Sequence, residues 1–391
     1  MLKTGLGSSK NEDSFAAGKE SCEKALSQVG GNADFLLVFS SSKFNLDELM
    51  RGISGVRGEA KLIGCTTAGE ITTDGSGKNS VAVLAVKGDS INFTTAMGGN
   101  LKDGAEQAGE ILAENLKKEN SDIHSIIMLT DVLSGNGADV VRGIQKVCGN
   151  DFLIVGGAAG DDFMFKETNE FCCDKVLSGY VVGAGLSGNF SKGVGVRHGW
   201  DTIGLPMKVT KSKGAVLKEL DGKPAVTIYE DYFGKKAEEL REEPLARMAI
   251  TYPLGMAVEG SDELLIRDPI SVDENGWITC AAEIPEGSEV RLMIGSKDKA
   301  IAAAKDAAES ALEQLGGKKA GVIIVFDCIA RQKLFGRDVN EEIEAIKGVF
   351  GAGVPIIGFY TYGEQAPLGG DMEKCFSSFH NETAVIFAIG E

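Results

Sequence analysis

The chain has 391 residues, of which 43% are hydrophobic and 25% charged, a composition typical of folded globular proteins. At this length two domains are favoured over a single hydrophobic core. The formal net charge of −17 at pH 7 excludes a broad nucleic-acid or membrane surface, because both partners are anionic and require basic side chains.

The amino-terminal sequence and the cysteines predict a cytoplasmic protein. The opening stretch MLKTGLGSSKNEDSFAAGKE lacks the apolar core of a signal peptide, and no apolar run approaches the ~20 residues that span a bilayer. The eight cysteines contain no CxxC pair, and the adjacent Cys172 and Cys173 have no second pair with which to hold a metal. Without a secretion signal, the cysteines are expected to be reduced thiols, many of them buried in strands.

Apolar runs and short polar motifs alternate along the chain in a repeated order. Three apolar runs, each of the length of a buried strand, occupy 35–42, 126–134 and 322–330. Each is followed by a motif: KLIGCTTAGEI at 61–71, a weaker copy FLIVGGAAGDD at 152–162, and PIIGFYTYGEQ at 355–365. A further apolar run follows each motif, at 81–86, 179–188 and 383–390. The pattern indicates an internal repeat.

Helical periodicity fills the gap between each first run and its motif. Val140, Ile144 and Val147 recur at spacings of three and four residues, and amphipathic helices are also expected near 101–118 and 299–315. The first two strands of each unit should therefore pair in parallel through a right-handed crossover. We predict an α/β fold in which repeated strand–helix–strand–strand units form mixed sheets.

The region 190–298 has a different texture. Short β-like pieces alternate with Gly and Asp turns, and one helical stretch, PAVTIYEDYFGKKAEELREEP, interrupts them. This pattern predicts a β-rich segment that begins a second domain, which the third α/β unit completes. The stretch GAGLSG at 183–188 matches a dinucleotide-binding pattern, but no amphipathic helix follows it, so it is interpreted as a Gly-rich strand packed closely against its neighbours.

The motifs lie where ligands of open α/β sheets bind, beyond the carboxyl ends of parallel strands. Glu70 and Glu364 hold equivalent places in two motifs, so the repeat could bring them to one cleft. The alternative is that each carboxylate only accepts hydrogen bonds within its own turn. Cys65 is a candidate nucleophile if a base activates it, and otherwise a small residue facing a core or pocket. Arg267 is a candidate clamp for a ligand carboxylate.

Several stretches in this order resemble the FIST family, whose name stands for F-box and intracellular signal transduction proteins. They are LIGCTTAGEI, GVRHGW, KVTKSKGAVLKELDGKPA, YPLGMAVEGSDELLIRDPISVDENG, IPEGSEVRLM and IIGFYTYGEQAP with HNETAVIFAIG. The resemblance covers about residues 30 to 390 and implies a two-module architecture: an amino-terminal extension with a helix at 1–30, a FIST N-terminal module at 31–205 and a FIST C-terminal module at 206–391. The family's signature positions fall on Gly64, Cys65, Gly69, Glu70, Arg267, Thr361, Gly363, Glu364, His380 and Asn381.

The resemblance implies a soluble sensory domain that binds a small, polar, amino-acid-like ligand in a cleft between the modules. The expected ligand-binding residues are Cys65, Thr66, Glu70, Arg267, Thr361, Tyr362, Glu364, His380 and Asn381. The sequence carries no attached kinase or cyclase segment, so a separate partner is expected, either a histidine kinase or a cyclic-di-GMP enzyme. Gly-rich strand edges make the amino-terminal sheet a candidate for pairing in a homodimer.

Two alternatives remain open from the sequence. In the first, the protein is a haem-binding nitric-oxide sensor in which His198 or His380 is the axial ligand. In the second, it is an enzyme that uses Cys65 or the Glu70/Glu364 pair. No metal site apart from haem is expected.

Overall fold

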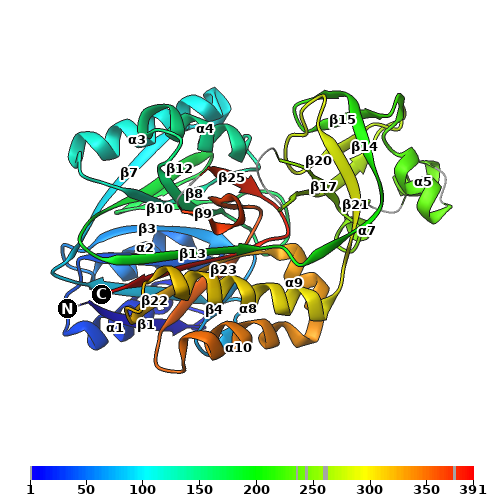
Figure 1. Cartoon of the computed structure of the whole chain (residues 1–391). Helices are drawn as coiled ribbons and strands as arrows, with labels where there is room; N and C mark the ends of the chain where they lie inside the picture. Colours follow the sequence, from blue (N-terminus) through cyan, green and yellow to red (C-terminus); the bar gives the residue numbers. More distant parts are fainter. Residues whose placement is uncertain (1, 235–236, 243–244, 259–262, 373–375) are drawn as a thin grey trace.

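The computed structural model describes residues 2–234, 237–242, 245–258, 263–372 and 376–391. Its body consists of three α/β units, and a β-rich segment, residues 200–295, lies beside them (Figure 1). The three units share one order of elements: strand, helix, strand, helix, strand, then a short hairpin and a last strand. This order confirms the predicted α/β fold with repeated units, and it adds a strand at the start of each. The helices predicted near 101–118 and 299–315 follow the first strands of the second and third units.

The elements of the first unit are β1 (Lys3–Ser9), α1 (Ser14–Val29), β2 (Phe35–Ser41), α2 (Leu46–Ser54), β3 (Lys61–Thr67), β4 (Glu70–Thr72), β5 (Gly75–Ser76) and β6 (Val81–Lys87). Those of the second are β7 (Ile91–Asn100), the 3₁₀ turn η1 (Leu101–Asp103), α3 (Ala105–Glu119), β8 (Ser125–Thr130), α4 (Gly137–Cys148), β9 (Leu153–Ala158), β10 (Glu170–Cys172), β11 (Lys175–Leu177) and β12 (Tyr180–Gly188). The third contains β13 (Ser191–Arg197), α8 (Lys297–Gln314), β22 (Ala320–Cys328), α9 (Ile329–Phe335), η2 (Gly336–Asp338), α10 (Val339–Phe350), β23 (Ile356–Thr361), β24 (Glu364–Pro367), η3 (Leu368–Gly370), β25 (Ser377–His380) and β26 (Ala384–Gly390).

Each unit builds a six-stranded mixed sheet, and the three sheets exchange their hairpins in a cycle. The strand orders are β1-β6-β2-β3-β10-β11, β25-β24-β9-β8-β12-β7 and β13-β26-β22-β23-β4-β5. The predicted parallel pairs are confirmed as β2 with β3, β8 with β9, and β22 with β23. The hairpin of the first unit completes the third sheet, that of the second completes the first sheet, and that of the third completes the second.

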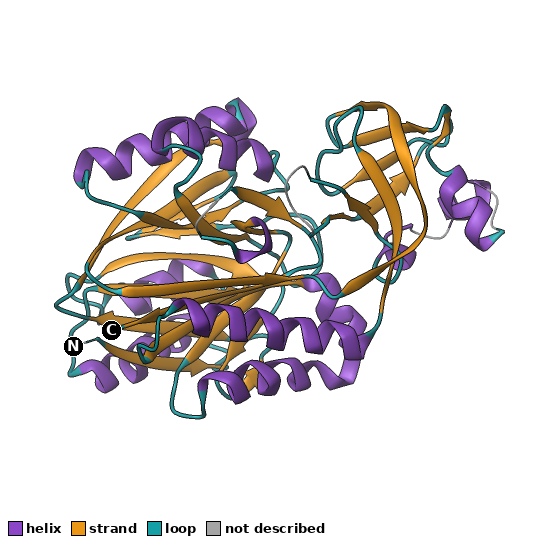
Figure 2. Ribbon diagram, viewed as in Figure 1, coloured by secondary structure: helices purple, strands orange, loops and turns teal. Residues whose placement is uncertain are grey.

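The sheets face one another across a shared apolar core, and the helices lie on the outside (Figure 2). Phe39 of the first sheet, Ile127 of the second and Phe359 of the third belong to this core. Because strands such as β2 are buried on both faces, their sequences are continuous apolar runs with no alternation. Side-chain caps begin the covering helices: the Asp13 carboxylate accepts a hydrogen bond from the Ala16 N–H at the start of α1.

The β-rich segment enters after β13 and returns to α8. Its elements are β14 (Trp200–Lys213), β15 (Val216–Leu220), β16 (Lys223–Pro224), α5 (Thr227–Phe233), α6 (Ala237–Glu242), α7 (Leu245–Ala249), β17 (Leu254–Met256), β18 (Leu265–Arg267), β19 (Pro269–Val272), β20 (Ile278–Cys280) and β21 (Glu289–Gly295). The segment has its own apolar core, which includes Val209, Leu217 and Ile278. This confirms the β-rich segment predicted in the second half of the chain.

Two further expectations concern helices and thiols. No helix in the described part of the chain is long and apolar enough to cross a bilayer. The cysteines of the described ranges are free thiols, and most are buried, as expected; Cys375 lies outside the described residues. The stretch GAGLSG lies in β12, where a Cβ on Gly185 would come within 2.8 Å of Ile123, which confirms a closely packed strand.

Candidate functional site

Each of the three units has a glutamate at a structurally equivalent position. In the first and third units this glutamate belongs to the motif, and in the second unit this glutamate, Glu170, is separated from the motif by a loop. In the exchanged hairpins Glu70 pairs with Phe359, Glu364 with Gly157 and Glu170 with Cys65. Gly157, Cys65 and Phe359 are themselves equivalent positions on the paired strands. The motif at 152–162 therefore contains no glutamate, because the loop 161–169 is inserted between this motif and Glu170 at the start of β10. All three glutamates are 0% exposed.

Glu70 and Glu364 each accept hydrogen bonds inside their own turn. Glu70 accepts from the hydroxyls of Thr67, at 2.8 Å, and Ser80. Glu364 accepts from the Thr361 hydroxyl and, at 3.2 Å, from the Thr383 backbone N–H. Burial raises the pKa of Glu70 to about 7 and that of Glu364 to about 8, against the opposing effect of these hydrogen bonds. Their geometry is that of groups that fix the strand tips, and neither residue lines any of the four cavities described for this structure.

Several other residues expected to bind ligand lie inside the protein. Cys65 is 0% exposed in the shared core, and burial raises its pKa well above the ordinary value. The Thr66 hydroxyl accepts a hydrogen bond from the Asn169 N–H at 3.0 Å. Arg267 donates to the backbone carbonyls of Glu283, Ile266 and Phe379 at 2.8, 2.9 and 3.2 Å. These contacts make Arg267 a link between the β-rich segment and β25.

The two histidines proposed as haem ligands do not have room for haem. His198 and His380 line a void of about 10 Å³, roughly the space of one water molecule. The His380 Nε2 is 3.0 Å from the Ala366 carbonyl, and the His198 Nδ1 accepts from the Trp200 N–H at 2.9 Å. Burial lowers the pKa of both imidazoles to about 4, so both are neutral and packed. Among the described residues no group of three or more His, Cys, Asp or Glu could hold a metal ion.

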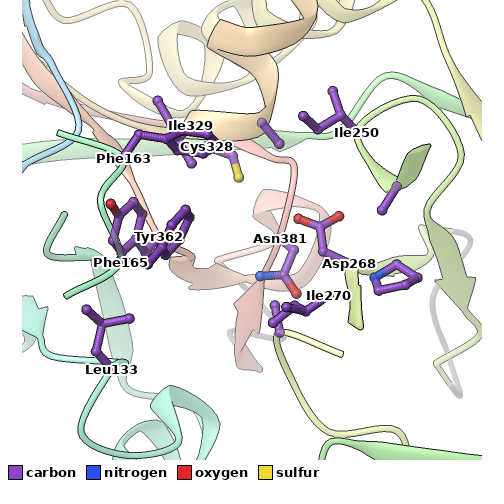
Figure 3. Close-up of a pocket in the computed structure, with 14 residues that line it drawn as sticks. Leu133, Phe163, Phe165, Ile250, Asp268, Ile270, Cys328, Ile329, Tyr362 and Asn381 are labelled. Carbon is purple, nitrogen blue, oxygen red and sulfur yellow. The ribbon is translucent and has the colours of Figure 1, made fainter. Parts of the chain in front are cut away.

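A cavity of about 510 Å³ lies where the β-rich segment meets the tips of the core strands (Figure 3). On the core side, the cavity is lined by the chain after β8, the loop after β9, the start of α9, the β23–β24 turn and the β25–β26 turn. From the β-rich segment, it is reached by the end of α7 and by the residues around β19 and β20. Its described lining is Leu133, Phe163, Phe165, Ala249, Ile250, Asp268, Pro269, Ile270, Ala281, Cys328, Ile329, Ala330, Tyr362 and Asn381.

One wall of the cavity is aromatic and is held by the inserted loop. Phe165 stacks on Tyr362 with ring centroids 4.3 Å apart, and Phe163 meets Phe165 edge-on at 5.0 Å. Asp161 organises the loop, because its carboxylate accepts from the Tyr362 hydroxyl and from four successive backbone N–H groups, the closest being that of Lys166 at 2.6 Å. Although burial opposes it, these hydrogen bonds lower the pKa of Asp161. The aromatic wall is therefore preformed.

The facing wall carries Asp268 and Asn381. Glu382 is fully buried and does not line the cavity, and its carboxyl lies within hydrogen-bonding range of the Asp268 carboxyl. Among the described residues no N–H or O–H donates to the Asp268 Oδ1, the Asn381 Oδ1 or either oxygen of Glu382. Burial raises the pKa of Asp268 to about 6 and that of Glu382 well above its ordinary value. Near neutral pH the two carboxyls therefore share one proton and one negative charge.

Of the nine ligand-binding residues expected from sequence, Tyr362 and Asn381 line this cavity. Sequence reasoning missed Asp268 and Glu382, although each directly follows a residue that it selected, Arg267 and Asn381. It also missed the loop residues Phe163 and Phe165, which are 39% and 51% exposed. The stretch DDFMF was the available signal, because three apolar side chains in a surface loop are unusual and often mark a binding region.

Comparisons with known proteins place the whole chain among relatives. A model of the FIST N domain matches residues 34–223, and a model of the FIST C domain matches residues 225–367. An uncharacterized protein of Mycobacterium tuberculosis is 26% identical over 388 residues, covering 94% of this chain and 96% of that protein. An uncharacterized protein of Methanocaldococcus jannaschii is 24% identical over 395 residues, covering 91% and 74%.

Similarity to solved structures is weak. A cyanuric acid hydrolase from A. caulinodans aligns over 100% of both chains with 8% identity and a TM-score of 0.38. The T. maritima PurL complexed with ADP gives a TM-score of 0.23 at 10% identity, covering 100% of this chain and 72% of that one. At these scores neither protein bears on the activity of the present chain.

Proposed function

The chain belongs to the FIST family, and on that premise we propose that it is a small-molecule sensor whose ligand occupies the 510 Å³ cavity. FIST domains are sensor domains of signal transduction. The cavity is the observation that carries the proposal. Its volume lies within the ~300–1,000 Å³ of ordinary ligand pockets, and it combines apolar walls with few polar groups, the usual composition of such sites.

The position of the cavity supports a sensing role. Leu133, Phe163 and Phe165 come from the region matched by the FIST N domain, whereas Ile250 and Ile329 come from the region matched by the FIST C domain. A ligand bound there contacts both. Ligand binding therefore stabilises one arrangement of the β-rich segment relative to the core. This shift between arrangements converts occupancy of the cavity into a signal.

The output of such a change passes to a separate protein. The partner class that the family resemblance implies is a histidine kinase or a cyclic-di-GMP enzyme, acting in the cytoplasm. The surface through which this partner would sense the cavity is the junction between the β-rich segment and the core, because that junction is where the ligand acts. Amino-acid-like molecules are the ligand class that the resemblance implies.

Ligand-dependent thermal stability tests the proposal. A compound that fills the cavity at 100 times its Kd should add about 2.7 kcal/mol to the free energy of unfolding and raise Tm accordingly. We expect a panel of small molecules with apolar bodies, screened by thermal shift, to contain such compounds.

The variant Phe165→Ala tests whether the compounds bind in this cavity. It removes an exposed ring that stacks on Tyr362, so binding should weaken about three- to tenfold, as expected for the loss of one aromatic contact. Leu205→Ala is the matched control, because Leu205 is 82% exposed on β14 and does not line the cavity. A panel without any binder, or binders that respond equally to both variants, would contradict the proposal.

A further inference from the structure

Next to the cavity the protein buries a group of acceptors that have few donors of their own. Glu382 is 0% exposed and Asn381 1% exposed, yet both oxygens of Glu382 and the Oδ1 of Asn381 receive no hydrogen bond from a described residue. The same is true of the Oδ1 of Asp268. Buried acceptors, above all charged ones, are normally paired, since leaving one unpaired costs roughly 1–3 kcal/mol or more. Glu382 and Asp268 pair with each other through one shared proton, and the negative charge that remains reaches the cavity at Asp268, which is partly exposed and lines it. A ligand that donates to this carboxylate is therefore favoured.

No described basic residue supplies the missing donors. Arg267 precedes Asp268 in the chain and its charge lowers the pKa of that carboxyl, but its N–H groups bond backbone carbonyls. Arg331 acts on Glu382 in the same way, while its guanidinium is paired with Asp327 and Glu342. The wall therefore keeps a negative potential.

The rest of the described lining contains no Lys or Arg. The Lys333 ammonium lies 4.1 Å from the centroid of the Phe163 ring, but Lys333 does not line the cavity. A ligand carboxylate inside the cavity would thus meet the negative charge of Asp268 with no described counter-charge in the lining. A cation, in contrast, is favoured both by the carboxyl pair and by the aromatic wall of Phe165 and Tyr362 (Figure 3).

We propose that the cavity selects a small protonated primary amine on an apolar or aromatic body, the ammonium donating to the Asp268 carboxylate and the body packing on Phe165 and Tyr362. This inference rests on the proposed function and refines its ligand class. A primary ammonium can donate N–H groups to the Asp268 carboxylate, whereas a quaternary one has no N–H to donate. A free amino acid adds an α-carboxylate that the acidic wall repels, so it binds less tightly than the corresponding amine.

Four indole compounds of similar size separate these features. Tryptamine carries the amine, tryptophan adds the carboxylate, tryptophol replaces the amine with a hydroxyl, and indole-3-propionate replaces it with a carboxylate. Isothermal titration of the full chain at pH 7.5 should give the tightest binding for tryptamine, with each of the other three weaker by about tenfold or more, as expected for a lost charged hydrogen bond. Equal affinity for tryptophol and tryptamine would overturn the amine selectivity while leaving a functional cavity. Failure of all four, together with an empty panel in the screen, would remove the proposed function too.

Variants locate the charge. Asp268→Asn should weaken tryptamine about tenfold or more and leave tryptophol within about threefold, because only the charge changes. Glu382→Gln should keep tryptamine within about threefold, because a side-chain amide can donate to Asp268 as the protonated carboxyl does. Asp306→Asn on the exposed face of α8 is the control with the same change in net charge. Equal effects of Asp306→Asn and Asp268→Asn would overturn the proposal, and circular dichroism confirms that each variant is folded.

Affinity should also follow the ionisation of the acidic wall. Asp268 has a pKa of about 6, so its carboxyl becomes mostly neutral as pH falls from 7.5 to 5. Tryptamine stays cationic over this interval and should therefore bind about tenfold more weakly at pH 5. In Asp268→Asn the affinity should be independent of pH over this interval. A wild-type affinity that does not change between these two pH values would contradict the assigned role of the carboxyl pair.

Discussion

Buried glutamates that hold strand tips are the most distinctive single residues of this protein. Glu364 is 0% exposed, and it accepts hydrogen bonds from the Thr361 hydroxyl and the Thr383 N–H. Burial raises its pKa to about 8, so it is mostly protonated at neutral pH. Whereas the sequence left a shared cleft and a local structural role open for Glu70 and Glu364, these contacts support the local role.

The pH dependence of stability should reveal this carboxyl. An unfolded glutamate ionises near its ordinary pKa, while folded Glu364 retains its proton up to about pH 8. Its contribution to the free energy of unfolding is therefore complete at low pH and is lost as pH rises through this interval, by up to about 1.4 kcal/mol per pH unit. Glu364→Gln should lose clearly less stability than wild type between pH 6 and pH 9, measured by urea unfolding.

The control for this measurement is Glu309→Gln, an exposed residue of α8 paired with Lys305. Its pH profile should follow that of wild type. If Glu364→Gln also follows wild type, Glu364 is ionised in the folded protein and the assigned protonation is wrong.

Neighbouring residues show how far sequence reasoning reached at this scale. It selected Arg267, whose N–H groups bond backbone carbonyls, whereas the next residue, Asp268, lines the cavity. Adjacent residues in extended chain face opposite sides, so a motif can identify the right stretch and still leave open which side chain faces the ligand. Only packing decides that.

At the scale of elements, close contact between helix and strand explains the high glycine content. A Cβ on Gly195 of β13 would lie 1.7 Å from the Ala307 carbonyl oxygen of α8, and one on Gly7 of β1 would lie 2.0 Å from the Ser21 carbonyl oxygen of α1. The first strand of these two units is therefore packed directly on a helix backbone. The alanine stripe of α8, including Ala304 and Ala308, permits the same closeness from the helix side.

Substitution of two glycines should have opposite effects on stability. Gly195→Ala forces β13 and α8 apart and should lower the free energy of unfolding by roughly 1–3 kcal/mol, the usual range for an overpacked core. Gly348→Ala is the matched control, because Gly348 lies in α10 with no atom within 4 Å of an added Cβ. It should raise stability by roughly 0.5–1 kcal/mol through better helix propensity. Chemical denaturation measures both, and a neutral Gly195→Ala would contradict the close packing.

The loop 161–169 conceals, at the level of sequence, the equivalence between Glu170 and the glutamates of the other two units. The periodicity of strands and helices predicted the three units and their parallel pairs, which the structure confirms. It could not show that Glu170 is the counterpart of Glu70 and Glu364, because the loop 161–169 separates Glu170 from its motif. Equivalence in a sheet is set by hydrogen-bonded register, and register is not visible as spacing when a loop intervenes.

At the scale of the whole molecule, the cyclic exchange of hairpins makes the three units interdependent. Each sheet is completed by strands from another unit, so no unit can complete its own sheet. The β-rich segment is attached differently. Its ends meet, since Trp200 and Gly295 pair opposite each other in β14 and β21, where cross-strand Cα atoms lie about 4.5–5.5 Å apart.

Excision should therefore separate folding from binding. Replacement of residues 201–294 by two glycines should leave a three-unit core that unfolds in a single cooperative transition, because the shared core and its three sheets stay complete. The same variant should lose tryptamine binding, because Asp268 and Ile270 are removed from the cavity. Circular dichroism and calorimetric titration measure the two properties.

Deletion of the β10–β11 hairpin, residues 170–177, is the contrasting variant. It removes two strands from the sheet of the first unit and should prevent cooperative folding. A folded hairpin deletion together with an unfolded excision variant would show that the interdependence has been assigned to the wrong parts.

The sequence by itself determined the elements and the family: periodicity specified strands, helices and parallel pairs, and the ordered motifs indicated both FIST modules. These properties depend on local residue patterns or on the order of motifs along the chain, so a single sequence is enough to predict them. The tertiary structure alone decided that Glu70 and Glu364 are hydrogen-bonded within their own turns and that the cavity forms where the β-rich segment meets the core. The physical reason is that a cavity and the buried acceptors beside it arise from packing between segments that are distant in sequence. Local sequence patterns do not indicate which distant segments will pack together.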